Sequence, residues 1–178
     1  EWALATLPAD RFLRIVDVGT GSGVLAVTLA AERESWHVEA VDISERAVAV
    51  ARDNARRQGV AGRLTFLIGD LLAPTMGAFD AIVANPPYVA RRDAPGLSPD
   101  VHDHEPHVAL FGGQDGMDVP ERLLNDAAQR LVPGGWLAME FGYGMQDPVE
   151  IAARNAGLTV VDVLEDLQGI ARTLIARR

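Results

Sequence analysis

The sequence contains no cysteine, which excludes disulfides, thiolate metal ligands and cysteine nucleophiles. No apolar run is long enough to span a bilayer, and the first residues carry no signal-peptide pattern. We therefore expect a cytoplasmic protein without membrane contact. Aromatic residues make up only 6% of the chain, whereas 48% of its residues are hydrophobic. That share is too high for a disordered chain, and 178 residues suffice for one domain with a sizeable core.

A broad basic surface is also missing from the sequence. The formal net charge is −9 and the sequence pI is about 4.8. Proteins that bind DNA or RNA by neutralising phosphates usually carry a basic face. The acidity weighs against this class without excluding it, and we expect no stable binding of nucleic acid.

Short apolar runs alternate with helical patterns along the whole chain, and no internal repeat is visible. The expected strands are Phe12–Val18, Val38–Ile43, Leu64–Ile68, Phe79–Ala84, Trp136–Phe141, Leu158–Leu164 and Thr173–Ala176. The expected helices are residues 2–7, Val24–Glu32, Ser44 to Gly59, Pro120–Leu131 and Pro148–Asn155, with Pro133-Gly134-Gly135 ending the fourth. This alternation predicts an α/β fold with an open, mostly parallel sheet and helices on both faces.

Candidate ligand-binding residues follow the carboxyl ends of four expected strands. The segment from Asp17 to Gly23 begins at the end of the first strand, and Asp42 lies at the end of the second. Asp70 follows the third strand and Asn85 follows the fourth. Open parallel sheets bind their ligands outside these ends, so we expect the four candidates to share one rim of the sheet.

Gly19, Gly21 and Gly23 form a G-x-G-x-G loop between a strand and a helix. Glycine permits positive φ and a close approach of ligand to backbone, and the helix N-terminus offers free N–H groups. The dinucleotide fingerprint G-x-G-x-x-G fails at Val24, and no P-loop lysine is present. A tight turn without a ligand remains the alternative to a ligand-binding loop.

Three carboxylates accompany this loop, and each has two interpretations. Asp42, nineteen residues after Gly23, can accept hydrogen bonds from both hydroxyls of a ribose or serve as an acid at a helix N-terminus. Asp70 can accept from an adenine amino group or cap a turn. Asp17 can hold the ammonium group of a ligand or brace the loop, because a buried carboxylate needs a partner.

Asn85-Pro86-Pro87-Tyr88 is the most informative segment of the chain. Its prolines have fixed φ and no N–H, so the backbone is stiff while its carbonyls stay free to accept hydrogen bonds. Asn85 adds a side-chain oxygen acceptor and an amide donor. This corner suits the binding of a planar NH2 group, against which Tyr88 can pack. Together with the glycine loop it indicates methyl transfer from S-adenosylmethionine to an amide or amino nitrogen; a rigid strand exit is the structural alternative.

These motifs resemble those of the class I S-adenosylmethionine-dependent methyltransferases, and more closely the HemK/PrmC-type protein-(glutamine-N5) methyltransferases of peptide chain release factors. The resemblance covers nearly the whole chain. Besides the glycine loop and Asn-Pro-Pro-Tyr, it rests on Asp42-Ile43-Ser44 with Ala47 and Asn54, Glu105-Pro106, Ala109-Leu110, Gly112-Gly113, Asp115-Gly116, Glu140-Phe141-Gly142 with Gln146, and Asp166-Leu167 with Gly169 and Arg172.

The resemblance implies a Rossmann-like class I fold with a seven-stranded, mostly parallel sheet whose last strand is antiparallel. Residues 1–178 are expected to form the methyltransferase domain, without the N-terminal helical domain that helps the family recognise release factors. Because the chain starts at Glu1 as if inside a helix, we expect an excised domain or fragment. The implied substrate is the glutamine of a Gly-Gly-Gln motif in a release factor. The chain's own Gly112-Gly113-Gln114 is interpreted as coincidence, not as a site of self-methylation.

The implied cofactor is S-adenosylmethionine, which becomes S-adenosylhomocysteine. The cofactor-binding residues are expected to be Asp17, Gly19, Thr20, Gly21, Gly23, Asp42, Ile43, Asp70, Leu71 and Asn85. The substrate is expected to contact Asn85, Pro86, Pro87 and Tyr88, of which Asn85, Pro86 and Tyr88 act in catalysis. The Asn85 side-chain oxygen and the Pro86 carbonyl are the expected acceptors for the amide hydrogens, and Tyr88 packs against the amide plane.

Other functions share some of these features. Asn-Pro-Pro-Tyr also resembles the motif of adenine-N6 DNA methyltransferases, and close variants occur in guanine-N2 ribosomal RNA methyltransferases. A cofactor-binding domain without activity is a further alternative. His102, His104 and His107 lie among acidic residues as metal ligands often do, but the hydrolase pattern H-x-H-x-D-H would need aspartate at Pro106. Methyl transfer requires no metal, and we expect none.

Overall fold

The structure is a computed structural model that describes residues 1–90, 92 and 110–178. Its elements are α1 (Trp2–Thr6), β1 (Leu13–Val18), α2 (Val24–Glu32), β2 (Trp36–Asp42), α3 (Glu45–Arg57), η1 (Ala61–Arg63), β3 (Leu64–Ile68), β4 (Phe79–Ala84), α6 (Asp118–Arg130), β5 (Leu131–Glu140), α7 (Gln146–Asn155), β6 (Thr159–Glu165) and β7 (Ala171–Arg177). Each expected strand and helix is present, with ends displaced by a few residues. Within the described ranges, no helix is both long and apolar enough to cross a bilayer.

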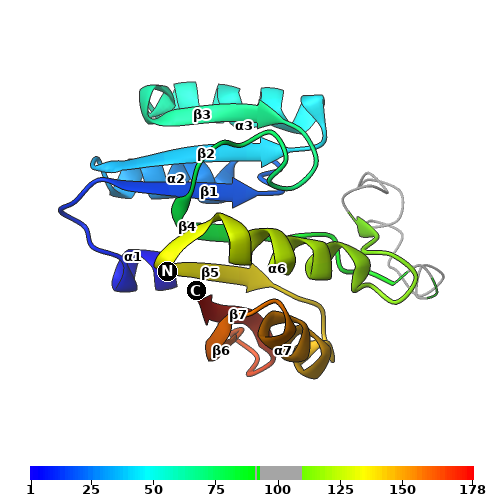
Figure 1. The fold of residues 1–178 in the computed structure, drawn as a ribbon. Coiled ribbons are helices and arrows are strands. Elements are labelled where there is room, and N and C mark those ends of the chain that lie inside the picture. Colours follow the sequence, from blue (N-terminus) through cyan, green and yellow to red (C-terminus); the bar gives the residue numbers. More distant parts are fainter. Residues whose placement is uncertain (91, 93–109) are drawn as a thin grey trace.

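The seven strands form one sheet in the order β3-β2-β1-β4-β5-β7-β6 (Figure 1). The pairs from β3 to β5 are parallel, whereas β7 runs antiparallel to both β5 and β6. This confirms the Rossmann-like class I fold with an antiparallel last strand. The strand order reverses between β1 and β4, and ligands of open α/β sheets bind at such a switch point.

Helices cover both faces of the sheet, as predicted (Figure 1). α1, α2 and α3 contribute to one buried apolar cluster, which includes Ile15 and Trp36. α6 and α7 contribute to the other, which includes Val16, Phe79 and Phe141. Successive residues of a strand point to opposite faces, so Ile15 and Val16 of β1 enter different clusters. Burial on both faces explains why the central strands read as continuous apolar runs.

One boundary prediction is wrong. Pro133-Gly134-Gly135 does not separate α6 from β5 but lies within β5, where the register against β4 is irregular. The Gly134 N–H donates to the Arg178 carbonyl at 2.8 Å, and the Arg178 N–H donates to the Gly135 carbonyl at 3.0 Å. These bonds to the end of the chain keep the segment in the sheet, and local turn chemistry alone does not reveal such distant partners.

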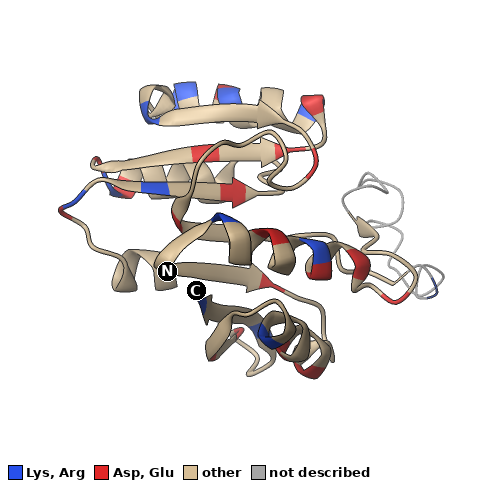
Figure 2. Ribbon diagram, viewed as in Figure 1, with Lys and Arg blue, Asp and Glu red and all other residues tan. Residues whose placement is uncertain are grey.

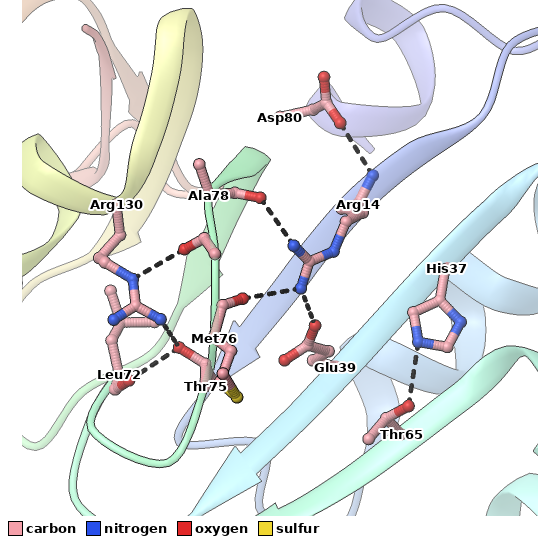
Figure 3. Close-up of polar contacts among 11 residues, drawn as sticks. Arg14, His37, Glu39, Thr65, Leu72, Thr75, Met76, Ala78, Asp80 and Arg130 are labelled. Carbon is pink, nitrogen blue, oxygen red and sulfur yellow. Dashed lines mark hydrogen bonds and ion pairs between the residues drawn. The ribbon is translucent and has the colours of Figure 1, made fainter.

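Arg14 of β1 fastens the segment that connects β3 to β4. Its guanidinium donates to the carbonyls of Met76 at 2.9 Å and Ala78 at 3.2 Å (Figure 3). The same group forms an ion pair with Glu39 of β2, a buried carboxylate, and lies over the Phe79 ring at 4.9 Å from its centroid. Arg14 therefore joins two strands to the connecting segment.

Arginines of α6 hold the same segment from the other side. Arg130 donates to the Gly77 carbonyl at 2.9 Å and to the Thr75 hydroxyl at 2.6 Å (Figure 3). Arg122 forms an ion pair with Asp70, at the start of the segment. The Arg122 contact lies beyond the carboxyl end of β3, and the Arg130 contacts lie before the amino end of β4, so α6 holds the connecting segment at both ends.

Replacing Arg14 with methionine should lower the free energy of unfolding by roughly 3 kcal/mol, because it leaves a buried carboxylate without its cation. Urea denaturation followed by circular dichroism measures this loss. The double variant Arg14→Met/Glu39→Leu should recover more than half of it, since no buried charge is then left unpaired. Equal losses in the single and double variants would show that the ion pair is not the source of the effect.

Candidate active site

The glycine loop and the Asn-Pro-Pro-Tyr segment meet at the switch point of the sheet. Gly19 directly follows β1 and Asn85 directly follows β4, the strand beside it. Gly19 has a φ of +72°, and a Cβ built on it would lie 3.2 Å from the Asn85 carbonyl oxygen. Asn85 is exposed, so its side chain is not packed into the core. The two motifs, far apart in the sequence, are therefore adjacent in space.

The glycine loop has one packed side and one open side. Gly23 has a φ of +82°, and a Cβ there would lie 2.8 Å from the Cβ of Ala51 in α3. From the same helix, the Asn54 amide donates to the Ser22 carbonyl at 2.9 Å. Gly21, with a φ of +56°, has no atom within 4 Å of such a Cβ among the described residues. Gly23 thus serves helix packing, while Gly21 leaves room above the loop.

Asp17 is buried beneath the loop, and one of its oxygens braces it. The Thr20 hydroxyl donates to Oδ2 at 2.7 Å, and the Ala26 N–H donates to the same atom at 3.1 Å. Among the described residues, no donor reaches Oδ1, which is also buried. Burial raises the pKa of Asp17 to about 6. The bracing role is therefore present in the structure, and Oδ1 keeps its capacity to accept from a cation.

Asp42 contacts both the glycine loop and the next helix. Its Oδ2 accepts from the Gly21 N–H at 2.9 Å, and its Oδ1 accepts from the Ser44 N–H at 2.8 Å. Ser44 caps α3 by accepting from the Ala47 N–H at 3.2 Å. A carboxylate oxygen can accept more than one hydrogen bond, so Asp42 keeps acceptor sites. Ile43, which follows it, is exposed although it is a large apolar residue.

Asp70 has a partner that neither sequence interpretation included. Its carboxylate is paired with Arg122 of α6, and both side chains are about half exposed. The next residue, Leu71, is buried and has a φ of +47°, a left-handed conformation that is uncommon for residues other than glycine. The chain therefore turns sharply at Asp70 and Leu71, directly beyond the end of β3.

Tyr88 is held by residues at the end of β5. Its hydroxyl donates to the Glu140 Oε1 at 3.2 Å. A Cβ on Gly142 would lie 3.0 Å from the Tyr88 Cδ2, so the ring lies against the Gly142 backbone. Acidic residues lie near the ends of β1, β2 and β5 (Figure 2). Glu140 entered the resemblance without an assigned role, although it ends β5 as Asp42 ends β2.

A second glycine-rich segment clamps the backbone around Tyr88. The Gly112 N–H donates to the Val89 carbonyl at 3.0 Å. A Cβ on Gly112 would lie 2.4 Å from the Pro87 carbonyl oxygen, and a Cβ on Gly116 would lie 2.3 Å from the Tyr88 carbonyl oxygen. Any side chain at these glycines would push the Asn-Pro-Pro-Tyr segment away. Close packing thus accounts for Gly112, the first residue of the local Gly-Gly-Gln, and for Gly116 beyond it.

Some sequence candidates lie outside the described residues. These are His102, His104 and His107, together with Glu105-Pro106 and Ala109 of the resemblance. Where the structure describes the chain, no group of three or more His, Asp or Glu side chains is placed to hold a metal ion.

Known proteins are similar to this chain in sequence. A release factor glutamine methyltransferase from Koribacter versatilis is 42% identical over 180 residues, covering 100% of this chain and 63% of the relative. One from Moorella thermoacetica is 46% identical, again covering 100% of this chain and 63% of the relative. These matches confirm the resemblance. The chain spans about three fifths of the length of these curated relatives.

Solved structures share the fold at lower identity. A ribosomal protein L11 methylase from Lactobacillus delbrueckii has a TM-score of 0.70 at 23% identity, covering 98% of this chain and 77% of that chain. A methyltransferase from Pyrococcus furiosus has a TM-score of 0.73 at 19% identity, covering 99% of this chain and 80% of that chain. The family described as Methyltransferase small domain matches residues 2–97. With the glycine loop and Asn-Pro-Pro-Tyr joined at the switch point of a class I sheet, the chain belongs to the Methyltransferase small domain family.

Proposed function

We propose that this chain transfers the methyl group of S-adenosylmethionine to the N5 amide nitrogen of a glutamine in the Gly-Gly-Gln motif of a peptide chain release factor. The observation that carries the proposal is the contact between Gly19 and Asn85, because it joins a cofactor loop to an amide-binding corner. The names of the relatives support the substrate. A release factor acts on the ribosome, so the reaction belongs in the cytoplasm.

The residues around the glycine loop fit S-adenosylmethionine. Gly21 leaves open space above the loop, and Asp42 keeps acceptor sites for the two ribose hydroxyls. The unsatisfied Asp17 Oδ1 matches the ammonium group of the methionine part. Exposed Ile43 would offer apolar surface to the adenine ring, and the turn at Leu71 would border the same part of the site. Thr20, which braces Asp17, and Gly23, which packs against α3, would support the loop, and Asp70 would accept from the adenine amino group beside Arg122.

The Asn-Pro-Pro-Tyr segment would hold the substrate amide. An amide nitrogen is a poor nucleophile, because its lone pair is delocalised into the carbonyl. S-adenosylmethionine supplies a sulfonium methyl group with a neutral leaving group, so the protein must mainly provide alignment, worth roughly 7–11 kcal/mol at best. The Asn85 side-chain oxygen and the Pro86 carbonyl accept the two amide hydrogens and stabilise the positive charge that develops on nitrogen. Pro87 stiffens the turn, and Tyr88 packs against the amide plane.

A protein substrate suits the charge of the chain better than nucleic acid does. The net charge is −9, and basic positions in Figure 2 are scattered among acidic ones. A duplex-binding enzyme needs cationic contacts to phosphates, which make its affinity strongly salt-dependent. A gel shift with DNA or RNA that weakens with added salt would instead favour a nucleic-acid substrate.

Replacing Asn85 with alanine should lower kcat about a hundredfold, the usual cost of one lost polar group that stabilises charge at a reacting centre. Methylation is measured by mass spectrometry, as the gain of one methyl group on the release factor peptide that contains Gly-Gly-Gln. The dissociation constant of S-adenosylmethionine should change less than threefold. Asn155→Ala, at an exposed position in α7, is the matched control. No methylation by the unaltered chain, or equal losses of rate and cofactor affinity in Asn85→Ala, would overturn the assignment.

Replacing Asp42 with alanine should weaken S-adenosylmethionine binding at least about tenfold, since hydrogen bonds to a charged group are worth roughly 1.5–3 kcal/mol each. Isothermal titration calorimetry gives the dissociation constant, and kcat at saturating cofactor should stay close to that of the unaltered chain. Asp53→Ala, which removes an exposed carboxylate of α3, is the control. An unchanged dissociation constant in Asp42→Ala would remove Asp42 from the cofactor site.

Cofactor binding should weaken as the pH falls through 6. Burial raises the pKa of Asp17 to about 6, and only the ionised carboxylate attracts an ammonium group. The free protein must therefore lose a proton before it binds at pH 5, which raises the dissociation constant roughly tenfold between pH 7 and pH 5. Calorimetry at both pH values measures the change. The Asp17→Asn variant has no titrating group at this position, so it should bind S-adenosylmethionine weakly and with the same dissociation constant at both pH values. A tenfold change of the dissociation constant that persists in this variant would assign the pH dependence to another group.

A further inference from the structure

We infer that Glu140 is a positioning residue for methyl transfer, because its carboxylate accepts the Tyr88 hydroxyl and thereby fixes the Tyr88 ring beside the substrate amide. The inference rests on the proposed function and goes beyond it, since Glu140 itself would touch neither substrate nor cofactor.

Glu140, which accepts the Tyr88 hydroxyl, lies on a rigid part of the molecule. Glu140 is the last residue of β5 and pairs with Thr173 of the antiparallel neighbour β7. The N–H of the next residue, Phe141, donates to the Arg172 carbonyl at 2.9 Å, and Phe141 is fully buried. Side chains on strands hold a geometry more accurately than side chains on loops do. Glu140 can therefore hold the Tyr88 hydroxyl at a fixed position relative to the sheet.

Packing against glycines also restrains Tyr88, at its ring and at its backbone carbonyl. A Cβ on Gly142 would lie 3.0 Å from the Tyr88 Cδ2 and 2.8 Å from the Met145 Sδ, so the ring and the thioether both lie close to the Gly142 backbone. At the backbone of the same residue, Gly116 packs against the Tyr88 carbonyl. A tyrosine has two side-chain torsions, and the hydrogen bond to Glu140 restrains both. The result is a flat apolar surface in a fixed orientation, which a planar amide requires.

The hydrogen bond also sets the direction of the hydroxyl proton. Because the Tyr88 O–H donates to Glu140, its proton points toward the end of β5. The amide hydrogens of a bound glutamine then meet acceptors only, as the development of positive charge on nitrogen demands. Without Glu140, the hydroxyl loses the acceptor that sets this direction.

Glu140→Ala should lower kcat about tenfold, since small displacements of positioning groups cost one to two orders of magnitude. The dissociation constant of S-adenosylmethionine should stay within about twofold, which separates positioning from loss of fold. Glu140→Gln, whose amide oxygen accepts the same hydrogen bond, should retain most of the rate. Glu165→Ala is the matched control, because Glu165 is exposed and ends β6 in the same sheet. Unchanged kcat in Glu140→Ala would overturn the inference.

A double-mutant cycle tests whether Glu140 acts through Tyr88. Tyr88→Phe removes the hydroxyl and should lower kcat by a factor similar to that of Glu140→Ala. In the Tyr88→Phe background, Glu140→Ala should then have no further effect, because the interaction is already absent. Losses that multiply would show two independent contributions and would contradict the inference.

A spectroscopic measurement distinguishes failure of this inference from failure of the proposed function. The chain has two tyrosines, so Tyr143→Phe, at an exposed position, leaves Tyr88 as the only one. In that background, the 13C chemical shift of the Tyr88 Cζ should change with Glu140→Ala and not with Glu165→Ala. An unchanged shift overturns the inference whatever the activity. If the shift changes but the unaltered chain methylates no release factor, the hydrogen bond stands, while the proposed function and the catalytic role of Glu140 fall together.

Discussion

The close approach of Gly19 to the Asn85 carbonyl is the constraint on which the site depends. β1 and β4 are parallel neighbours whose last residues, Val18 and Ala84, stand opposite each other. The two segments that leave these strands therefore start side by side. Glycine suits position 19 because its φ is positive and because a Cβ there would lie 3.2 Å from the Asn85 carbonyl oxygen, closer than ordinary van der Waals contact. This contact brings the proposed cofactor loop next to the proposed amide-binding corner.

Carboxylates keep this arrangement in place before any ligand binds. Asp17 and Asp42 each accept backbone N–H groups at or beside the glycine loop, so the loop is held in one conformation by the residues that we also assign to the cofactor. Binding then requires little reordering of the backbone, which is the general advantage of a preorganised site. This arrangement buries Asp17, and the burial disfavours the charged form of its carboxyl and raises its pKa to about 6.

Helix α6 connects the two sides of the site. It begins at Asp118, two residues after Gly116, which packs against the Tyr88 carbonyl. One turn further along, Arg122 pairs with Asp70 at the turn beyond β3. The proposed substrate corner and the proposed adenine side are thus tied to one rigid element, and the Arg14 network fastens the same connecting segment from the sheet.

Local patterns in the sequence were sufficient to predict the strands and helices, the parallel sheet, the glycine loop and the Asn-Pro-Pro-Tyr corner. Apolar periodicity, glycine and proline act over a few residues, so each signal is complete within its own segment. The partners of these segments were not predictable in this way. Tyr88 with Glu140 and Asp70 with Arg122 are each separated by 52 residues, and Pro133-Gly134-Gly135 lies in a strand because the end of the chain binds it. Only the order of the strands in the sheet decides which distant side chains meet, and that order exists only in the folded protein.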